Sequence, residues 1–66
     1  MAIAKIIEVS ASSTVGFEDA VSSGIAKAAE TVSGISGAWV KDMKVKVRDG
    51  KISEWRVHLS ITFIVK

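Results

Sequence analysis

Residues 55–66 alternate apolar and polar side chains almost without a break, and this alternation constrains the fold more than any other feature. A period of two is typical of a β-strand, whose side chains point in turn to opposite faces. The apolar face carries Trp55, Val57, Leu59, Ile61, Phe63 and Val65. The polar face carries Arg56, His58, Ser60 and Thr62. We therefore expect the rest of the chain to cover the apolar face, and we consider the polar face for a ligand site.

The chain has 66 residues, enough for a single domain over residues 1–66 with one small core. A domain of this size buries only about 60% of the surface that its unfolded chain exposes. The usual supports are disulfides, a structural metal or oligomerisation. With no Cys and one His, the chain cannot form a disulfide and offers few metal ligands. Because 48% of its residues are hydrophobic and its mean hydropathy is +0.37, we expect self-association to bury more apolar surface.

The net charge of +2 is too small to indicate a nucleic-acid-binding protein. No apolar run approaches the roughly 18 residues of a membrane span, and the first residues lack the pattern of a secretory signal. We therefore expect a cytoplasmic protein with neither a nucleic-acid nor a membrane partner. The absence of Cys is consistent with a reducing compartment.

Residues 5–9 form a short apolar run before the turn-prone residues 10–14, which predicts a first strand followed by a loop. The apolar period then changes to three and four, at Phe17, Ala20, Val21, Gly24, Ile25, Ala28 and Val32. This spacing predicts an amphipathic helix of about 18 residues. The residues that mark its ends are Ser13 or Thr14 as the cap, Glu18 and Asp19 in the first turn, and Gly34 and Gly37 at the exit.

Strand spacing returns over residues 38–47, and Asp49-Gly50 is a strong signal for a two-residue hairpin turn into the last strand. The chain therefore has the order β-α-β-β, which places it in the α+β class. A right-handed crossover makes the first two strands parallel, and the third, antiparallel to both, lies between them. The predicted fold is a three-stranded antiparallel sheet wrapped around one helix.

A two-residue turn also determines the register of the hairpin. Counted from a pair between Arg48 and Lys51, the predicted partners are Met43 with Arg56, Lys41 with His58, and Trp39 with Ser60. Trp39 then shares a face with Arg56 and His58. Val45 and Val47 fall on this face too, away from the apolar side of the last strand. Either this second face is also buried, or a bulge shifts the strand by one residue.

Catalysis requires a base within reach of a nucleophile, and His58 is the only imidazole. Its place inside the apolar alternation favours a structural or cavity-facing role, so we do not expect an enzyme. Asp42, Asp49 and Glu54 are spread along the hairpin and predict solvated charges rather than a metal site. The alternative is a cation site assembled from such carboxylates across a subunit interface.

The hairpin is basic and carries both Trp residues. Its cations are Lys41, Lys44, Lys46, Arg48, Lys51 and Arg56. Together with two aromatic rings they are the ingredients of single-strand nucleic-acid binding. No glycine-rich phosphate loop or aromatic RNA-binding motif accompanies them, so lysines that protect an edge strand from aggregation are the favoured interpretation. Trp55 lies in phase with Val57 and is expected in the core, whereas Trp39 can offer its ring to a flat aromatic ligand.

Several segments resemble, in order and spacing, the dodecin family of small flavin-binding proteins. They are Lys5-Ile6-Ile7-Glu8-Val9 with Ser12-Ser13, Gly16-Phe17-Glu18-Asp19-Ala20-Val21, Asp49-Gly50-Lys51-Ile52, and the alternation of Val57, Leu59, Ile61 and Phe63. The resemblance covers nearly the whole chain. It implies a hollow sphere of twelve β-α-β-β subunits, a homododecamer, with flavin as the ligand.

In that family, a Trp that opens the second strand stacks on the isoalloxazine ring, and a Gln in the third strand hydrogen-bonds it. Aligned without gaps from the hairpin, these positions are Gly37 and Arg56 here, and Lys44-Val45 replaces the family's Arg-Gly. Trp39 lies two residues beyond Gly37 on the same strand face. A two-residue slip at the helix exit would let Trp39 take the stacking role.

The resulting hypothesis is a protein that binds and sequesters flavin (riboflavin, FMN or FAD) for storage or buffering inside a hollow oligomer. Trp39 is the candidate stacking group, and Arg56 would pair with a carbonyl or phosphate oxygen. The other candidate cofactor contacts are Gly37, Lys41 and His58. The alternative is a dodecin-like shell that has lost flavin and serves as a structural or metal-ion-binding assembly.

Overall fold

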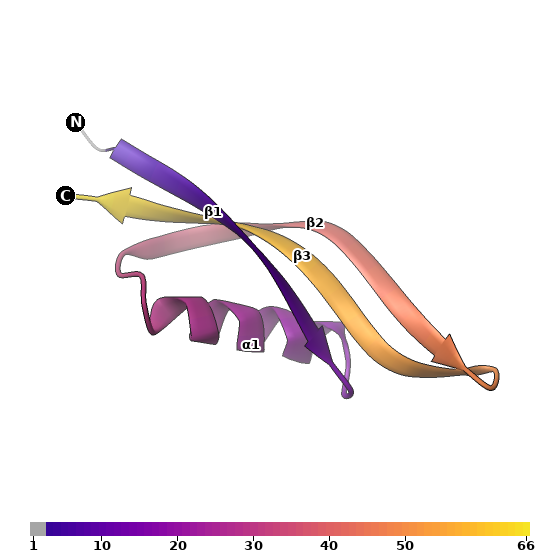
Figure 1. Cartoon of the computed structure of the whole chain (residues 1–66). Helices are drawn as coiled ribbons and strands as arrows, with labels where there is room; N and C mark the ends of the chain where they lie inside the picture. Colours follow the sequence, from indigo (N-terminus) through magenta and orange to yellow (C-terminus); the bar gives the residue numbers. More distant parts are fainter. Residues whose placement is uncertain (1–2) are drawn as a thin grey trace.

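The computed structural model describes residues 3–66. Its elements are β1 (Ile3–Ser13), α1 (Phe17–Ala29), β2 (Ile35–Arg48) and β3 (Lys51–Val65). The sheet has the order β1-β3-β2, and both outer strands run antiparallel to β3 (Figure 1). The predicted β-α-β-β order and the central place of the last strand are therefore confirmed. Within residues 3–66, α1 is the only helix, and it is neither long nor apolar enough to span a membrane.

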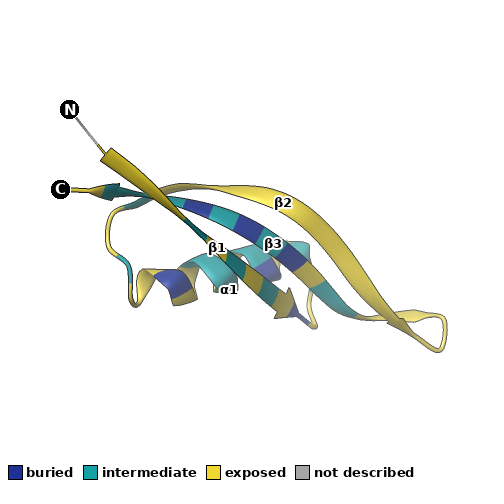
Figure 2. Cartoon of the chain, turned by 45° about the horizontal axis from the view of Figure 1, so that its top comes forward, coloured by how far each residue is buried: buried dark blue, intermediate teal, exposed yellow. Residues whose placement is uncertain are grey.

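The helix packs against one face of the sheet, chiefly under β1 and β3, and the β2–β3 hairpin extends past it (Figure 1). The core enclosed by this packing consists of Ala20, Ala28, Val57, Leu59 and Ile61. Leu59 and Ile61 are 0% exposed, so the helix buries the apolar face of β3 as the alternation predicts. Figure 2 shows the contrast with β2, which is exposed along nearly its whole length.

A strip of apolar side chains on β2 is left uncovered. It consists of Val40, Met43 and Val45, which pair with Leu59, Val57 and Trp55 of β3. Paired residues point to the same side of a sheet, so this apolar strip lies on the helix side. Its three residues are nevertheless exposed, because α1 lies under β1 and β3 rather than under β2.

Several predicted boundaries are wrong. β1 begins at Ile3 rather than at residue 5, and β2 begins at Ile35 rather than at residue 38. β1 continues through residues 10–13, which the sequence predicts as loop, because pairing with β3 outweighs their turn preference. The helix has 13 residues, fewer than the about 18 that the periodicity predicts. Beyond it, the amides of Thr31 and Val32 both donate to the Ala28 carbonyl, and the chain then leaves through Gly34 at a φ of 79°. A side chain at Gly34 would lie 2.7 Å from the Ile64 carbonyl oxygen, so this exit requires glycine.

The Ser13 hydroxyl orders the approach to α1 without capping it. Its oxygen accepts hydrogen bonds from the backbone amides of Val15 (2.9 Å) and Gly16 (3.4 Å), and its proton is donated to Asp19 at 2.6 Å. Both amides precede the helix, and Gly16 occupies the N-cap position. The predicted cap at Ser13 or Thr14 is therefore wrong, whereas the acidic first turn is confirmed.

The hairpin begins as predicted and then changes register. Asp49 and Gly50 have φ values of 52° and 74°, as a type I′ turn requires, and Arg48 pairs with Lys51. An irregularity between Lys46 and Val47 then shifts the pairing by one residue. The observed partners are Lys44 with Arg56, Met43 with Val57, and Val45 with Trp55.

A second bulge, between Val40 and Asp42, leaves Lys41 as the extra residue and restores the predicted register, so Trp39 pairs with Ser60. The predicted pairs of Met43 with Arg56 and of Lys41 with His58 are wrong, and His58 lies opposite Asp42 instead. The placement of Val45 on the Trp39 face is also wrong. Of the two alternatives that the sequence left open, the bulge is the one observed.

Candidate ligand-binding site

The sheet face turned away from α1, which we call the open face, carries polar side chains from all three strands. Its rows are Glu8, Ser60 and Trp39, then Ser10, His58 and Asp42, then Ser12, Arg56 and Lys44. Because paired residues share a side of the sheet, Trp39, His58 and Arg56 lie on one face, as the sequence predicts. Trp39 is 65% exposed there.

Glu8 connects the three strands through a hydrogen-bonded network. Its Oε1 atom accepts from Lys41 Nζ at 3.0 Å and from His58 Nε2 at 2.7 Å. A carboxylate can only accept, so His58 carries a proton on Nε2, and in neutral His58 the Nδ1 atom accepts from the Ser10 hydroxyl at 3.2 Å. The hydrogen bond from His58, and then that from Lys41, lowers the pKa of Glu8.

Lys41 reaches two partners because it is the extra residue of the second bulge. Its ammonium binds Glu8 and also lies 5.5 Å from the centroid of the Trp39 ring, within the range of a cation–π contact. Bulges re-aim a side chain in this way. A cation therefore lies over the Trp39 ring, and the residue remains 65% exposed.

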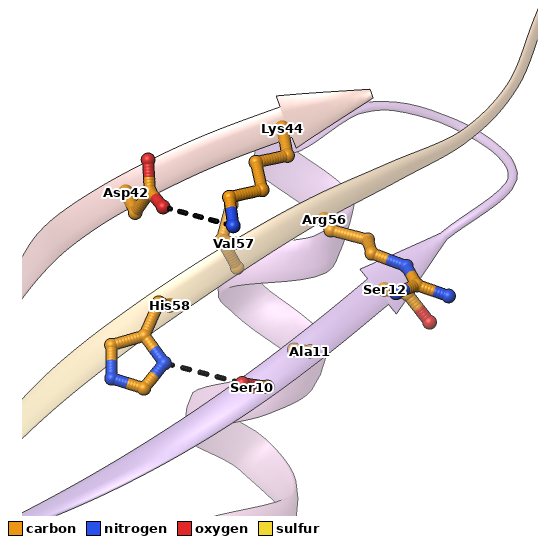
Figure 3. Close-up of a pocket in the computed structure, with 8 residues that line it drawn as sticks. All are labelled: Ser10, Ala11, Ser12, Asp42, Lys44, Arg56, Val57 and His58. Atoms are coloured by element: carbon orange, nitrogen blue, oxygen red, sulfur yellow. Dashed lines mark hydrogen bonds and ion pairs between the residues drawn. The ribbon is translucent and has the colours of Figure 1, made fainter. Parts of the chain in front are cut away.

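A hollow of about 290 Å³ lies further along the open face (Figure 3). Its polar lining consists of Ser10, Ser12, Asp42, Lys44, Arg56 and His58. Both cations contact a carboxylate of their own strand: Lys44 Nζ lies 3.5 Å from Asp42, and Arg56 Nε lies 3.1 Å from Glu54. The Lys44 and Arg56 side chains remain 72% and 54% exposed, so both charges are accessible from solvent.

All five candidate contacts lie on the open face, but in two groups. Gly37 pairs with Thr62 next to Trp39 and Lys41. Apart from Gly37 and its two chain neighbours, no atom of the described residues lies within 4 Å of the position of a Cβ at Gly37. Arg56 lies four residues along β3 from Ser60, the partner of Trp39, with His58 between the two groups. Trp55, predicted in the core, is partly buried on the helix side.

Glu8 is not among the site residues predicted from the sequence, although it joins Lys41 to His58. The available signal was its phase, since Glu8 is two residues from Ser10 on a strand and so points to the same face. The missing information was the position of the bulge that brings Lys41 within reach. Ser12 and Lys44 were missed as lining residues for the same reason, because both depend on the observed register.

A family model for dodecins matches residues 3–66. This chain belongs to the dodecin family. The match covers both strands of the hairpin, the helix and β1, and therefore every residue of the open face described above. A search among curated proteins found no significant match.

Solved dodecins have the same fold. A dodecin from Streptomyces davaonensis is 22% identical, with a TM-score of 0.93 over 98% of this chain and 96% of the other. A Thermus thermophilus dodecin variant is 23% identical, with a TM-score of 0.94 over 100% and 98%. A protein described as a calcium dodecin from Mycobacterium tuberculosis is 26% identical, with a TM-score of 0.82 over 97% and 91%.

Proposed function

We propose that this dodecin binds and sequesters flavin on the open face, for storage or buffering, with Trp39 as the stacking group. The observation that carries the proposal is the Trp39 ring, which lies 5.5 Å from the Lys41 ammonium and remains 65% exposed. Aromatic ligands bind such rings through offset stacking. Gly37 leaves space beside the ring, and Arg56 and His58 supply polar contacts further along β3.

We also propose that the chain works as a hollow homododecamer in the cytoplasm. Its own core is small, and the apolar strip of β2 has no cover within the described residues 3–66. Contact with further copies of the chain would bury this strip and supply stability that one small core lacks. The ligand would then lie in an enclosed space, which suits sequestration.

Binding rather than catalysis is the role that the network supports. Ser10, His58 and Glu8 are hydrogen-bonded in series, in the order of a hydrolytic triad. However, Glu8 is also bound to Lys41, and Ser10 is exposed in the middle of a paired strand. Backbone amides that pair with a neighbouring strand cannot converge on a reacting oxygen, as catalysis of acyl transfer requires.

The proposal is tested by titrating riboflavin with the purified full-length protein and following flavin fluorescence. Stacking against Trp39 is expected to quench this fluorescence to saturation, and light scattering on the same sample is expected to give the mass of a dodecamer. A Trp55→Phe variant controls for the loss of a Trp outside the open face, because Trp55 lies on the helix side of the sheet. It is expected to quench flavin fluorescence as the parent does. An unquenched titration would refute flavin binding.

A second candidate function is that of a shell that has lost flavin binding and serves as a structural or metal-ion-binding assembly. The related calcium dodecin is the observation that favours it. Within residues 3–66 of one chain, however, no three or more His, Asp or Glu side chains are grouped to hold an ion. Such a site would need carboxylates from more than one subunit. Calorimetric titration with calcium, beside the riboflavin titration, distinguishes the two candidates.

A further inference from the structure

Met43 lies in the apolar strip of β2, between Val40 and Val45. Its side chain points to the helix side of the sheet, because its partner on β3 is the buried Val57. The residue is nevertheless 52% exposed, since α1 lies chiefly under β1 and β3 (Figure 2). A thioether is therefore presented to solvent on a surface that is otherwise aliphatic.

Met43 takes no part in the core of its own subunit. Within residues 3–66, the buried core comes from α1 and β3, and Met43 is not among the side chains packed against it. A chemical change confined to the Met43 side chain is therefore expected to leave the fold of one subunit intact. Its effect would fall on the contact between the apolar strip and its cover.

In the proposed assembly, a second copy of this chain covers the strip. The cover comes over the face of the strip and not as a strand added at this point of the β2 edge. The reason is that the Met43 amide already donates to the Asp42 carboxylate at 3.0 Å, so it is not free to pair with a further strand. The Met43 side chain is then exposed in the free subunit and buried in the assembled one.

We infer that Met43 is an oxidation site whose state controls the assembly of the subunits. This inference rests on the assembly proposed above, and its oxidant is hydrogen peroxide. A lone pair of the Met43 sulfur attacks one peroxide oxygen, so that an S–O bond forms and the O–O bond breaks. The other oxygen takes both protons and leaves as water. The sulfur loses two electrons and becomes a sulfoxide, and the peroxide is reduced.

The sulfoxide replaces a flexible apolar side chain with a polar one. Its neighbours on the strip, Val40 and Val45, are aliphatic and cannot donate a hydrogen bond from their side chains to the new oxygen. Burial of a polar group without a partner is costly, so oxidised subunits stay apart. A sulfoxide reductase reverses the change: the oxygen leaves as water, and the dithiol that supplies the electrons becomes a disulfide.

The test oxidises the free chain and then follows its assembly. The full-length protein is unfolded in urea, treated with hydrogen peroxide, freed of both reagents and refolded. Peptide mass spectrometry locates the sulfoxide, and light scattering gives the mass. The oxidised protein is expected to lose the large species and to keep the far-UV circular dichroism of the untreated, refolded parent. Sulfoxide reductases for both epimers, supplied with a dithiol, should restore the large species.

Two variants separate Met43 from other targets of peroxide. Met43→Leu keeps an apolar side chain of similar volume without the sulfur, so its mass should be the same with and without peroxide. Met1, the other methionine of the sequence, is still present in this variant and serves as its internal control. Met43→Gln places a polar, unbranched side chain at this position and should lose the large species without peroxide.

Three outcomes would overturn the inference. The first is a protein oxidised at Met43 that regains the parental mass, which would leave the proposed assembly intact. The second is loss of the large species in peroxide-treated Met43→Leu, which would place the damage at another residue. The third is equal sulfoxide content in the assembled and unassembled fractions of a partly oxidised sample, separated by gel filtration. If the native parent itself has the mass of one 7.0 kDa subunit, the proposed assembly fails and the oxidation switch fails with it.

Discussion

The ammonium group of Lys41 lies 5.5 Å from the centroid of the Trp39 ring, although the two residues are separated by only one position on a strand. A regular strand would hold these side chains roughly parallel, without such an approach. The bulge at Lys41 redirects its side chain, and the contact with Glu8 Oε1 at 3.0 Å holds it in place. Glu8 on β1 thereby holds the cation that lies over the Trp39 ring on β2.

Removing the Glu8 carboxylate is expected to uncover the Trp39 ring. In a Trp55→Phe background, where Trp39 is the only fluorescent indole, Glu8→Gln should release Lys41 and increase quenching of Trp39 emission by acrylamide. Lys41→Ala should have the same effect, because it removes the covering group directly. Glu30→Gln, at the C-terminal end of α1, is the control. Equal quenching in the parent and in both variants would show that Lys41 does not cover the ring.

The network also predicts how stability depends on pH. Hydrogen bonds from His58 and then Lys41 lower the pKa of Glu8 below its ordinary value of 4.5. Between the folded and the ordinary pKa the unfolded chain binds more protons, so stability is complete above about 4.5 and is lost as the pH falls through the folded pKa. Urea denaturation from neutral to acid pH should therefore show a smaller loss in Glu8→Gln. Identical acid profiles for the variant and the parent would contradict this account.

Close packing of α1 on the sheet predicts that Gly24 is required. A Cβ at this position would lie 2.9 Å from Ala11 Cβ and 3.1 Å from Leu59 Cδ1. Gly24→Ala gains about 1 kcal/mol of helix propensity, but overpacking of a core costs about 1–3 kcal/mol. We expect a net loss of about 1 kcal/mol in the free energy of unfolding, measured by urea denaturation. Ser23→Ala, at an exposed position of the same helix, should be neutral or slightly stabilising, and a stabilised Gly24→Ala would refute the close approach.

The apolar strip predicts where assembly can be broken. Val45 is exposed on the helix side of β2, so a charge placed there would be buried without a partner if other subunits cover the strip. Val45→Lys should therefore lower the mass measured by light scattering. Lys46→Gln, on the next residue of the same strand, is the control for a general effect of substitution. A Val45→Lys variant with the parental mass would show that the interface lies elsewhere.

The sequence predicted the fold because one strong signal dominates it. The alternation in residues 55–66 identifies a central strand, and Asp49-Gly50 identifies the hairpin, so the order of elements follows. Local signals failed where tertiary pairing opposes them, as at residues 10–13, which are turn-prone by composition but pair with β3. They also failed at the end of the helix. There, the hydrogen bonds from the Thr31 and Val32 amides to the Ala28 carbonyl and the positive φ of Gly34 determine how the chain leaves α1.

The sequence predicts which residues of the candidate site share a face of the sheet, but not which of them contact one another. The alternation of side chains along each strand predicts that Trp39, His58 and Arg56 share one face. The two register shifts between the turn and Trp39 cancel, so Trp39 still pairs with Ser60 and stays on that face. The contacts of Lys41, Lys44 and Glu8 depend on where the two bulges lie. A bulge is chosen by packing across strands rather than by the local sequence, so these contacts required the structure.

The most direct test of the account is riboflavin binding by the parent protein and by Trp39→Ala, measured side by side by fluorescence titration. Stacking of one ring on an aromatic side chain contributes about 1–3 kcal/mol. We predict saturable quenching by the parent and a Kd at least about tenfold weaker in a Trp39→Ala variant that retains the parental mass. Equal affinity in the two proteins, or no quenching by the parent, would contradict it.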